Sequence, residues 1–133
     1  MSKFEPIARD AFLFDDWIVG EFRRTGGFTA LVMLVSTANL EVLPLRSTFM
    51  HVIGDELTWI GLTDLMRSAG VAWDGIFIMP LVHEAGGPVE DSAARAALRA
   101  LEKRVIENRM VINEGHFFDK WGRRMKVEEA QAQ

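Results

Sequence analysis

The segment from Ala72 to Arg109 constrains the fold more than any other part of the chain. It starts with an apolar run at residues 75–82, continues through Gly86-Gly87-Pro88, and ends in a long alanine-rich stretch. Bulky apolar residues occupy both alternating faces of the run, which is typical of a strand that is covered on both sides. In the alanine-rich stretch, apolar residues recur at helical spacing and acidic residues precede basic ones, as a helix dipole favours. The segment therefore predicts a buried strand followed by a helix at about residues 88–108.

The N-terminal part of the chain predicts a helix and two strands. Apolar residues recur every three or four positions from Pro6 to Arg24, and Gly26-Gly27 follows them, so we expect a helix over this stretch. Residues 28–36 carry no charge and are apolar on both alternating faces, which favours a strand buried on both sides, with a helix as the alternative. Residues 40–45 are expected to form a short edge strand, because Pro44 has no N–H to donate to a neighbouring strand.

Turn signals predict two hairpins in the rest of the chain. Residues 48–53 and 57–62 flank Gly54-Asp55-Glu56, and a hairpin there places His51 opposite Trp59. A short turn of helix is expected to follow at residues 65–68.

The C-terminal part predicts a strand at residues 110–113 and then a hairpin. In that hairpin Phe117-Phe118 pairs with residues 125–127 around a turn at 119–122. A helix from His116 to Glu129 is the alternative. Residues 128–133 are expected to be a frayed tail.

Together these elements predict an α+β fold. We expect a two-layer single domain over residues 1–133, with a mainly antiparallel sheet of about five strands, an N-terminal helix and the long helix at about 88–108. A chain of 133 residues suits one domain with its own core.

Charge and composition exclude several classes of function. The net charge of −4 argues against binding nucleic acid by neutralising phosphates, and the basic segment 120–126 is expected to be a solvated turn and strand. The absence of cysteine excludes disulfides and thiolate chemistry. The longest apolar run, residues 28–35, is too short to span a bilayer, and the N-terminus lacks the apolar core of a signal peptide. We therefore expect a soluble cytoplasmic protein that does not act at a membrane.

Two histidines with neighbouring carboxylates are the candidates for catalysis. They form the pairs His83 with Glu84 and His116 with Asp119, which suit acid–base chemistry or a metal such as zinc, nickel or iron. The spacing of these residues matches no metal signature. His83 and Glu84 are adjacent, and adjacent residues of a strand point to opposite faces, so the two side chains do not readily share one substrate atom. Taken singly, His83 is expected to bond a backbone group near the turn, His116 to be an exposed turn residue, and His51 to pack across strands on Trp59. We expect neither a metal at His83 and His116 nor any other cofactor.

Three of the four tryptophans are the candidates for ligand binding. Trp59, Trp73 and Trp121, with His51, are candidate lining residues of an apolar pocket, but aromatic residues more often anchor cores and interfaces. Gly86-Gly87-Pro88 before the long helix is a poor phosphate site, because the proline removes an amide and acidic residues already occupy the first turn.

The sequence favours a non-catalytic assembly or adaptor domain. Hydrophobic residues make up 49% of the chain, including nine Phe, four Trp and seven Met, an excess that suits a homo-oligomeric or partner-protein interface. The alternatives are a small-molecule binding module with an aromatic pocket and a metal-dependent or acid–base enzyme built on the two histidine–carboxylate pairs.

Overall fold

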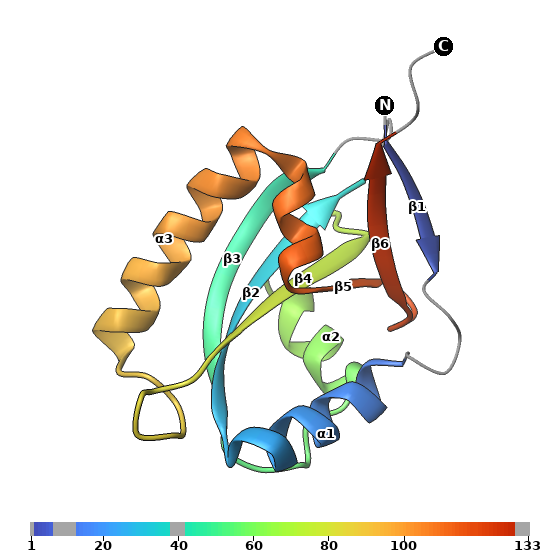
Figure 1. The fold of residues 1–133 in the computed structure, drawn as a ribbon. Helices are drawn as coiled ribbons and strands as arrows, with labels where there is room; N and C mark the ends of the chain where they lie inside the picture. Colours follow the sequence, from blue (N-terminus) through green and yellow to red (C-terminus); the bar gives the residue numbers. More distant parts are fainter. Residues whose placement is uncertain (1, 7–12, 38–41, 130–133) are drawn as a thin grey trace.

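The computed structural model describes residues 2–6, 13–37 and 42–129 (Figure 1). These residues form six strands, three α-helices and one 3-10 helix in a mixed α+β arrangement, so the predicted fold class is confirmed. In chain order the elements are β1 (Ser2–Pro6), α1 (Phe14–Thr25), β2 (Phe28–Ser36), β3 (Leu43–Val52), α2 (Trp59–Arg67), β4 (Gly75–Leu81), α3 (Asp91–Glu107), η3 (Arg109–Glu114), β5 (His116–Asp119) and β6 (Arg124–Glu129).

All strands belong to one antiparallel sheet with the order β1-β6-β5-β4-β2-β3. The sheet exceeds the expected number of strands because Ser2–Pro6 pairs with β6. No strand was expected at the N-terminus, and Pro6 was expected to begin a helix that runs to Arg24. That helix begins at Phe14 in the described residues, and Pro6 instead ends a strand at the edge of the sheet, where proline is tolerated. The predicted end of the helix is confirmed, since Gly26 has a φ of 73° and its N–H bonds to the carbonyl of Phe22.

The helices are divided between the two faces of the sheet. Alternate residues of β2 contact opposite covers: Ala30, Val32 and Leu34 pack with α1 and α2, whereas Leu31, Met33 and Val35 pack with α3 and η3. The first eight residues of β2 and the first four of β4 are buried, so the prediction that these strands are covered on both faces is confirmed. The long helix is confirmed with its predicted buried stripe of Ala94, Leu98, Leu101 and Val105.

The predicted hairpin of residues 48–62 is wrong. Its first half belongs to the ten-residue strand β3, and its second half is the start of α2. Thr58 caps α2 by accepting a hydrogen bond from the N–H of Gly61, and Leu62 and Met66 bury one face of the helix against the sheet. The helix predicted at 65–68 is therefore the end of α2. His51 lies opposite Thr29 of β2, and not opposite Trp59.

The C-terminal hairpin is confirmed and the strand predicted before it is wrong. Residues 110–113 lie in η3, where Val111 and Ile112 are buried against α3 and its side of the sheet. β5 and β6 are joined by a turn in which Gly122 has a φ of 80° and donates to the carbonyl of Asp119 at 3.0 Å. Residues 128 and 129 pair with β1, so the predicted frayed tail begins too early; residues 130–133 lie outside the described part of the chain.

The expected edge strand at residues 40–45 is confirmed in part. Leu43 and Pro44 begin β3, which forms one edge of the sheet, whereas residues 40 and 41 lie outside the described part.

Candidate functional site

The structure does not bring the two histidine–carboxylate pairs together. His116 lies in β5 opposite Ile78 of β4, whereas His83 lies in the loop beyond the end of β4. Five residues of extended chain separate Ile78 from His83, a length of about 16 Å, so His83 lies far from His116. Within the described residues no group of three His, Cys, Asp or Glu side chains is arranged to hold a metal ion.

Each member of these pairs has a separate local environment. The Nδ1 of His83 accepts a hydrogen bond from the N–H of Ala85 at 3.0 Å, in agreement with the expected backbone bond, and Glu84 is exposed beside it. Asp119 accepts bonds from the N–H groups of Trp121 and Arg123 and from the Arg123 guanidinium at 2.8 Å. This carboxylate organises the turn between β5 and β6.

His116 is partly buried in a strand, so the expectation of an exposed turn residue is wrong. Its ring packs on Trp17 with centroids 4.5 Å apart. The Nδ1 of His116 and the Nε1 of Trp17 are both buried, and neither has a hydrogen-bond partner in the described structure. The contact therefore joins β5 to α1 chiefly through ring packing.

Trp17 lies in the core, Trp59 and Trp73 pack against it, and Trp121 is exposed, so the tryptophans do not line a common pocket. Trp59 packs edge-on against Trp73 at 6.4 Å and donates from Nε1 to the carbonyl of Lys120. Trp121 is exposed on the β5–β6 turn, and the charged groups of Lys120 and Arg123 lie 5.1 and 5.0 Å from the centre of its ring. Arg124 of the same basic segment lies over Phe118, and burial lowers the pKa of its guanidinium.

A polar network missed by the sequence reasoning lies beside β3. Thr29 Oγ1 is 2.8 Å from His51 Nδ1, and His51 Nε2 is 2.7 Å from an oxygen of Asp91. The Asp91 carboxylate only accepts, and the His51 tautomer that donates to it from Nε2 accepts at Nδ1 from the Thr29 hydroxyl. The same hydroxyl accepts a bond from the N–H of Val89 at 3.0 Å. The order Asp, His, Thr resembles a nucleophilic triad, but Thr29 is 0% exposed and no substrate reaches it. The network ties β2 and β3 to the start of α3.

We expect Thr29→Val to lower the free energy of unfolding by about 2 kcal/mol, because it leaves the Val89 N–H and His51 Nδ1 without their partner. Chemical denaturation measures this change. Thr29→Ser keeps the hydroxyl and is the matched control, with a smaller loss. A loss in Thr29→Val no larger than that in Thr29→Ser would show that the hydroxyl contributes no more to stability than the methyl group does.

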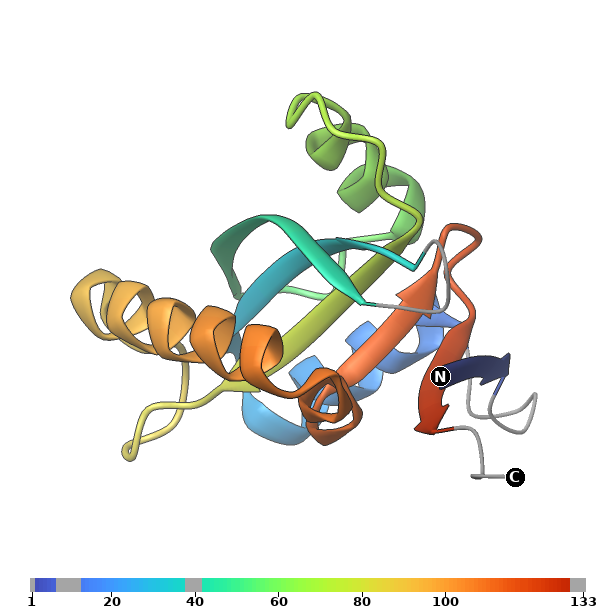
Figure 2. The same cartoon turned by 90° about the horizontal axis from the view of Figure 1, so that it is seen from above.

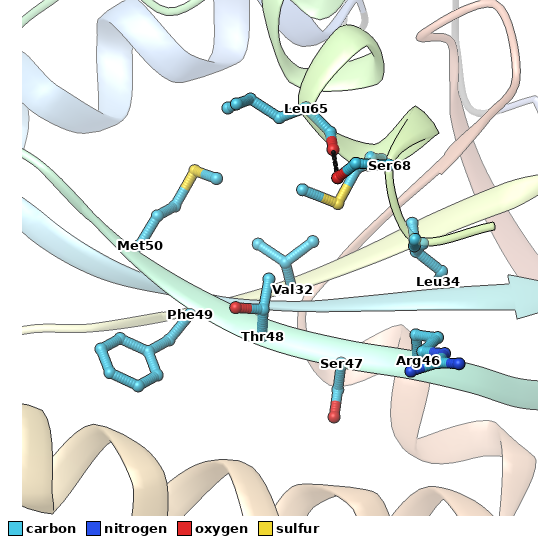
Figure 3. Close-up of a pocket in the computed structure, with 11 residues that line it drawn as sticks. Val32, Leu34, Arg46, Ser47, Thr48, Phe49, Met50, Leu65 and Ser68 are labelled. Atoms are coloured by element: carbon cyan, nitrogen blue, oxygen red, sulfur yellow. Dashed lines mark hydrogen bonds between the residues drawn. The ribbon is translucent and has the colours of Figure 1, made fainter. Parts of the chain in front are cut away.

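A groove lies between β3 and α2, and we call it the β3–α2 groove. It consists of two adjoining hollows of about 350 and 420 Å³, which share Met50 and Leu65. Figure 3 shows Val32 and Met50 pointing from the sheet toward α2, whereas Phe49 points to the opposite side. Arg46 lines the first hollow and Glu56 lines the second. The groove is therefore largely apolar, with one charge of each sign.

The edge of the sheet beside this groove is open. Among the described strands β3 pairs only with β2, and Figure 2 shows it between α2 and α3, which lie on opposite sides of it. Pro44 and an irregularity in the pairing of β3 with Leu34 and Val35 interrupt the start of the strand. Residues 46–52 contain no proline and form a regular ladder with β2. Leu65 on the rim of the groove is 57% exposed.

Comparisons with models of known families, with curated proteins and with solved structures find no significant match to the chain. Within the described residues no helix is long and apolar enough to cross a membrane.

Proposed function

We propose that this chain is a non-catalytic assembly or adaptor domain that binds a protein segment along β3 and in the β3–α2 groove. The observation that carries the proposal is the regular open edge at residues 46–52 beside an apolar groove. An open edge offers backbone N–H and C=O groups to another strand, and a neighbouring groove takes up the side chains that this strand presents.

The polar network supports a binding role for this edge. Thr29, His51 and Asp91 hold β3 against β2 and α3 through hydrogen bonds of 2.7 and 2.8 Å. On the same side, Ser47 donates to Glu102 of α3 at 2.6 Å. An edge that is fixed before binding loses less conformational entropy when it pairs with a second strand.

A small molecule in the groove is the second candidate. The favouring observation is the size of the hollows, about 350 and 420 Å³, which falls within the usual range for ligand sites. An organic adduct that is retained in native mass spectrometry, and lost in a variant whose larger side chain fills the groove, would favour this second function. The cytoplasmic location and the exclusion of nucleic acid stay predictions from the sequence.

The test of the main proposal is a charge placed on the rim of the groove. We expect the purified chain to bind either itself or extended peptides selected from a random display library, and Leu65→Lys to weaken this binding at least about tenfold. Ile106→Lys is the matched control, because Ile106 is an apolar residue of α3 that is 72% exposed. The proposal would be contradicted if the chain bound neither itself nor any selected peptide, or if Leu65→Lys left the binding affinity unchanged.

A further inference from the structure

We propose that the strand bound at this edge is β3 of a second copy of the chain, paired antiparallel about a two-fold axis at Met50. The inference rests on the proposed function, because it names the partner of the same edge. Its first support is symmetry: in a two-fold interface, a residue before the axis faces the residue equally far after it on the other copy. Met50 is one of the two residues that both hollows share, so the axis falls at the middle of the groove.

The charges of the groove change sign across this axis. Arg46 and Gly54 are equally far from Met50 in sequence, and the Glu56 carboxylate folds back beside Gly54, 3.3 Å from where a Cβ on that glycine would lie. Pairing about Met50 therefore brings Arg46 of each copy toward Glu56 of the other. Opposite charges at both ends favour this register and speed encounter between copies.

Both charges are available for such a contact. Among the described residues neither Arg46 nor Glu56 forms an ion pair or a side-chain hydrogen bond. On the α3 side of β3, by contrast, the carboxylates of Asp91 and Glu102 already accept hydrogen bonds from His51 and Ser47. Arg95 of α3 lies over the ring of Phe49.

The limits of β3 fit the same register. Pairing about Met50 covers Thr48–Val52 in each copy and leaves Pro44, with the irregular pairing next to it, outside the new ladder. The same pairing places the exposed Leu65 and Ile53 of each copy at the new interface, where apolar surface is removed from water. The two sheets then form one continuous antiparallel sheet.

Charge reversal tests this arrangement. In sedimentation velocity over a range of concentrations we expect a dimer of the parent chain, and a dimer Kd raised at least about tenfold in Arg46→Glu and in Glu56→Arg. Each single variant places like charges together at both ends of its own dimer.

An equimolar mixture of the two variants restores dimerisation, because every contact between unlike copies again joins opposite charges. Lys120→Glu, a reversal on the β5–β6 turn, which β4 and β2 separate from β3 in the sheet, is the control and leaves the dimer intact.

A cross-link provides an independent measurement. The chain has no cysteine, so Met50→Cys introduces a unique thiol on the proposed axis. Residues directly opposite each other in an antiparallel pair have Cα atoms about 4.5–5.5 Å apart, which suits a disulfide. We expect mild oxidation to yield a covalent dimer from Met50→Cys, and little from the exposed control Ile106→Cys.

A parent chain that stays monomeric up to about 100 μM, far above the Kd of a stable specific dimer, would overturn the inference. Failure of the mixed variants to dimerise, or equal cross-linking of the two cysteine variants, would also overturn it. The proposed function has its own outcome: if the chain is monomeric but selected peptides bind through Leu65, only the identity of the partner is wrong. If neither copies nor peptides bind, both are wrong.

Discussion

Replacing Phe118 by alanine is expected to lower the free energy of unfolding by about 3–5 kcal/mol, the usual cost of removing a fully buried phenylalanine. Phe118 is 0% exposed and lies at the centre of an aromatic cluster. Its ring is 5.4 Å from Phe14, 5.6 Å from Trp17 and 6.0 Å from Trp59. The side chain therefore joins β5 to both helices on one face of the sheet, and its removal leaves a cavity that rigid neighbours cannot fill.

Urea denaturation followed by far-ultraviolet circular dichroism measures this loss. Trp121→Ala is the control, because Trp121 is an exposed aromatic residue from the same hairpin. A surface substitution of this kind usually changes stability by about 0.5 kcal/mol or less. A loss of stability in Phe118→Ala as small as that in Trp121→Ala would show that the aromatic cluster does not hold β5 to the helices.

The sequence was sufficient where one pattern dominated a long segment. β2 and β4 are apolar on both alternating faces, and α3 combines a helical stripe with charges that suit its dipole. The β5–β6 turn was predictable for a similar reason, because Gly122 supplies the positive φ that this turn requires. The edge position of β3 was signalled by Pro44 alone.

The sequence was insufficient where a short segment suits two structures. Residues 57–62 are mostly apolar and follow a turn signal, so they resemble the second strand of a hairpin. Their helical state depends on the Thr58 cap and on burial of Leu62 and Met66 against the sheet, and this burial is a tertiary effect. The error also misplaced Trp59, which packs in the aromatic cluster and not across from His51.

The candidate site depends almost wholly on tertiary structure. The Thr29–His51–Asp91 network joins three segments that are far apart in sequence, so no spacing rule identifies it. The β3–α2 groove exists because α2 packs beside β3, and the predicted hairpin had placed these residues in two paired strands. Nothing in the sequence around Arg46 or Glu56 indicates a binding role. Their proposed role depends on their positions in the two hollows on either side of Met50.

Replacing Gly115 by alanine is expected to lower the free energy of unfolding by about 3 kcal/mol, at the upper end of the usual cost of overpacking. A Cβ on Gly115 would lie 2.6 Å from the backbone oxygen of Ile78 and 2.6 Å from a ring carbon of Phe77. Backbone in a paired strand cannot move as a flexible side chain does, because β4 is hydrogen-bonded to both β2 and β5. The added methyl group must therefore displace β5 or distort its ladder with β4.

Gly20→Ala provides the matched control for this substitution. Gly20 lies within α1, and a Cβ there would meet nothing within 4 Å, so only the backbone effect of the substitution remains. Alanine at a helical glycine position is expected to raise the free energy of unfolding by about 0.5–1 kcal/mol. The same chemical change is thus expected to have opposite signs at the two positions. A Gly115→Ala variant as stable as the parent chain would show that β5 does not approach Ile78 as closely as this fold requires.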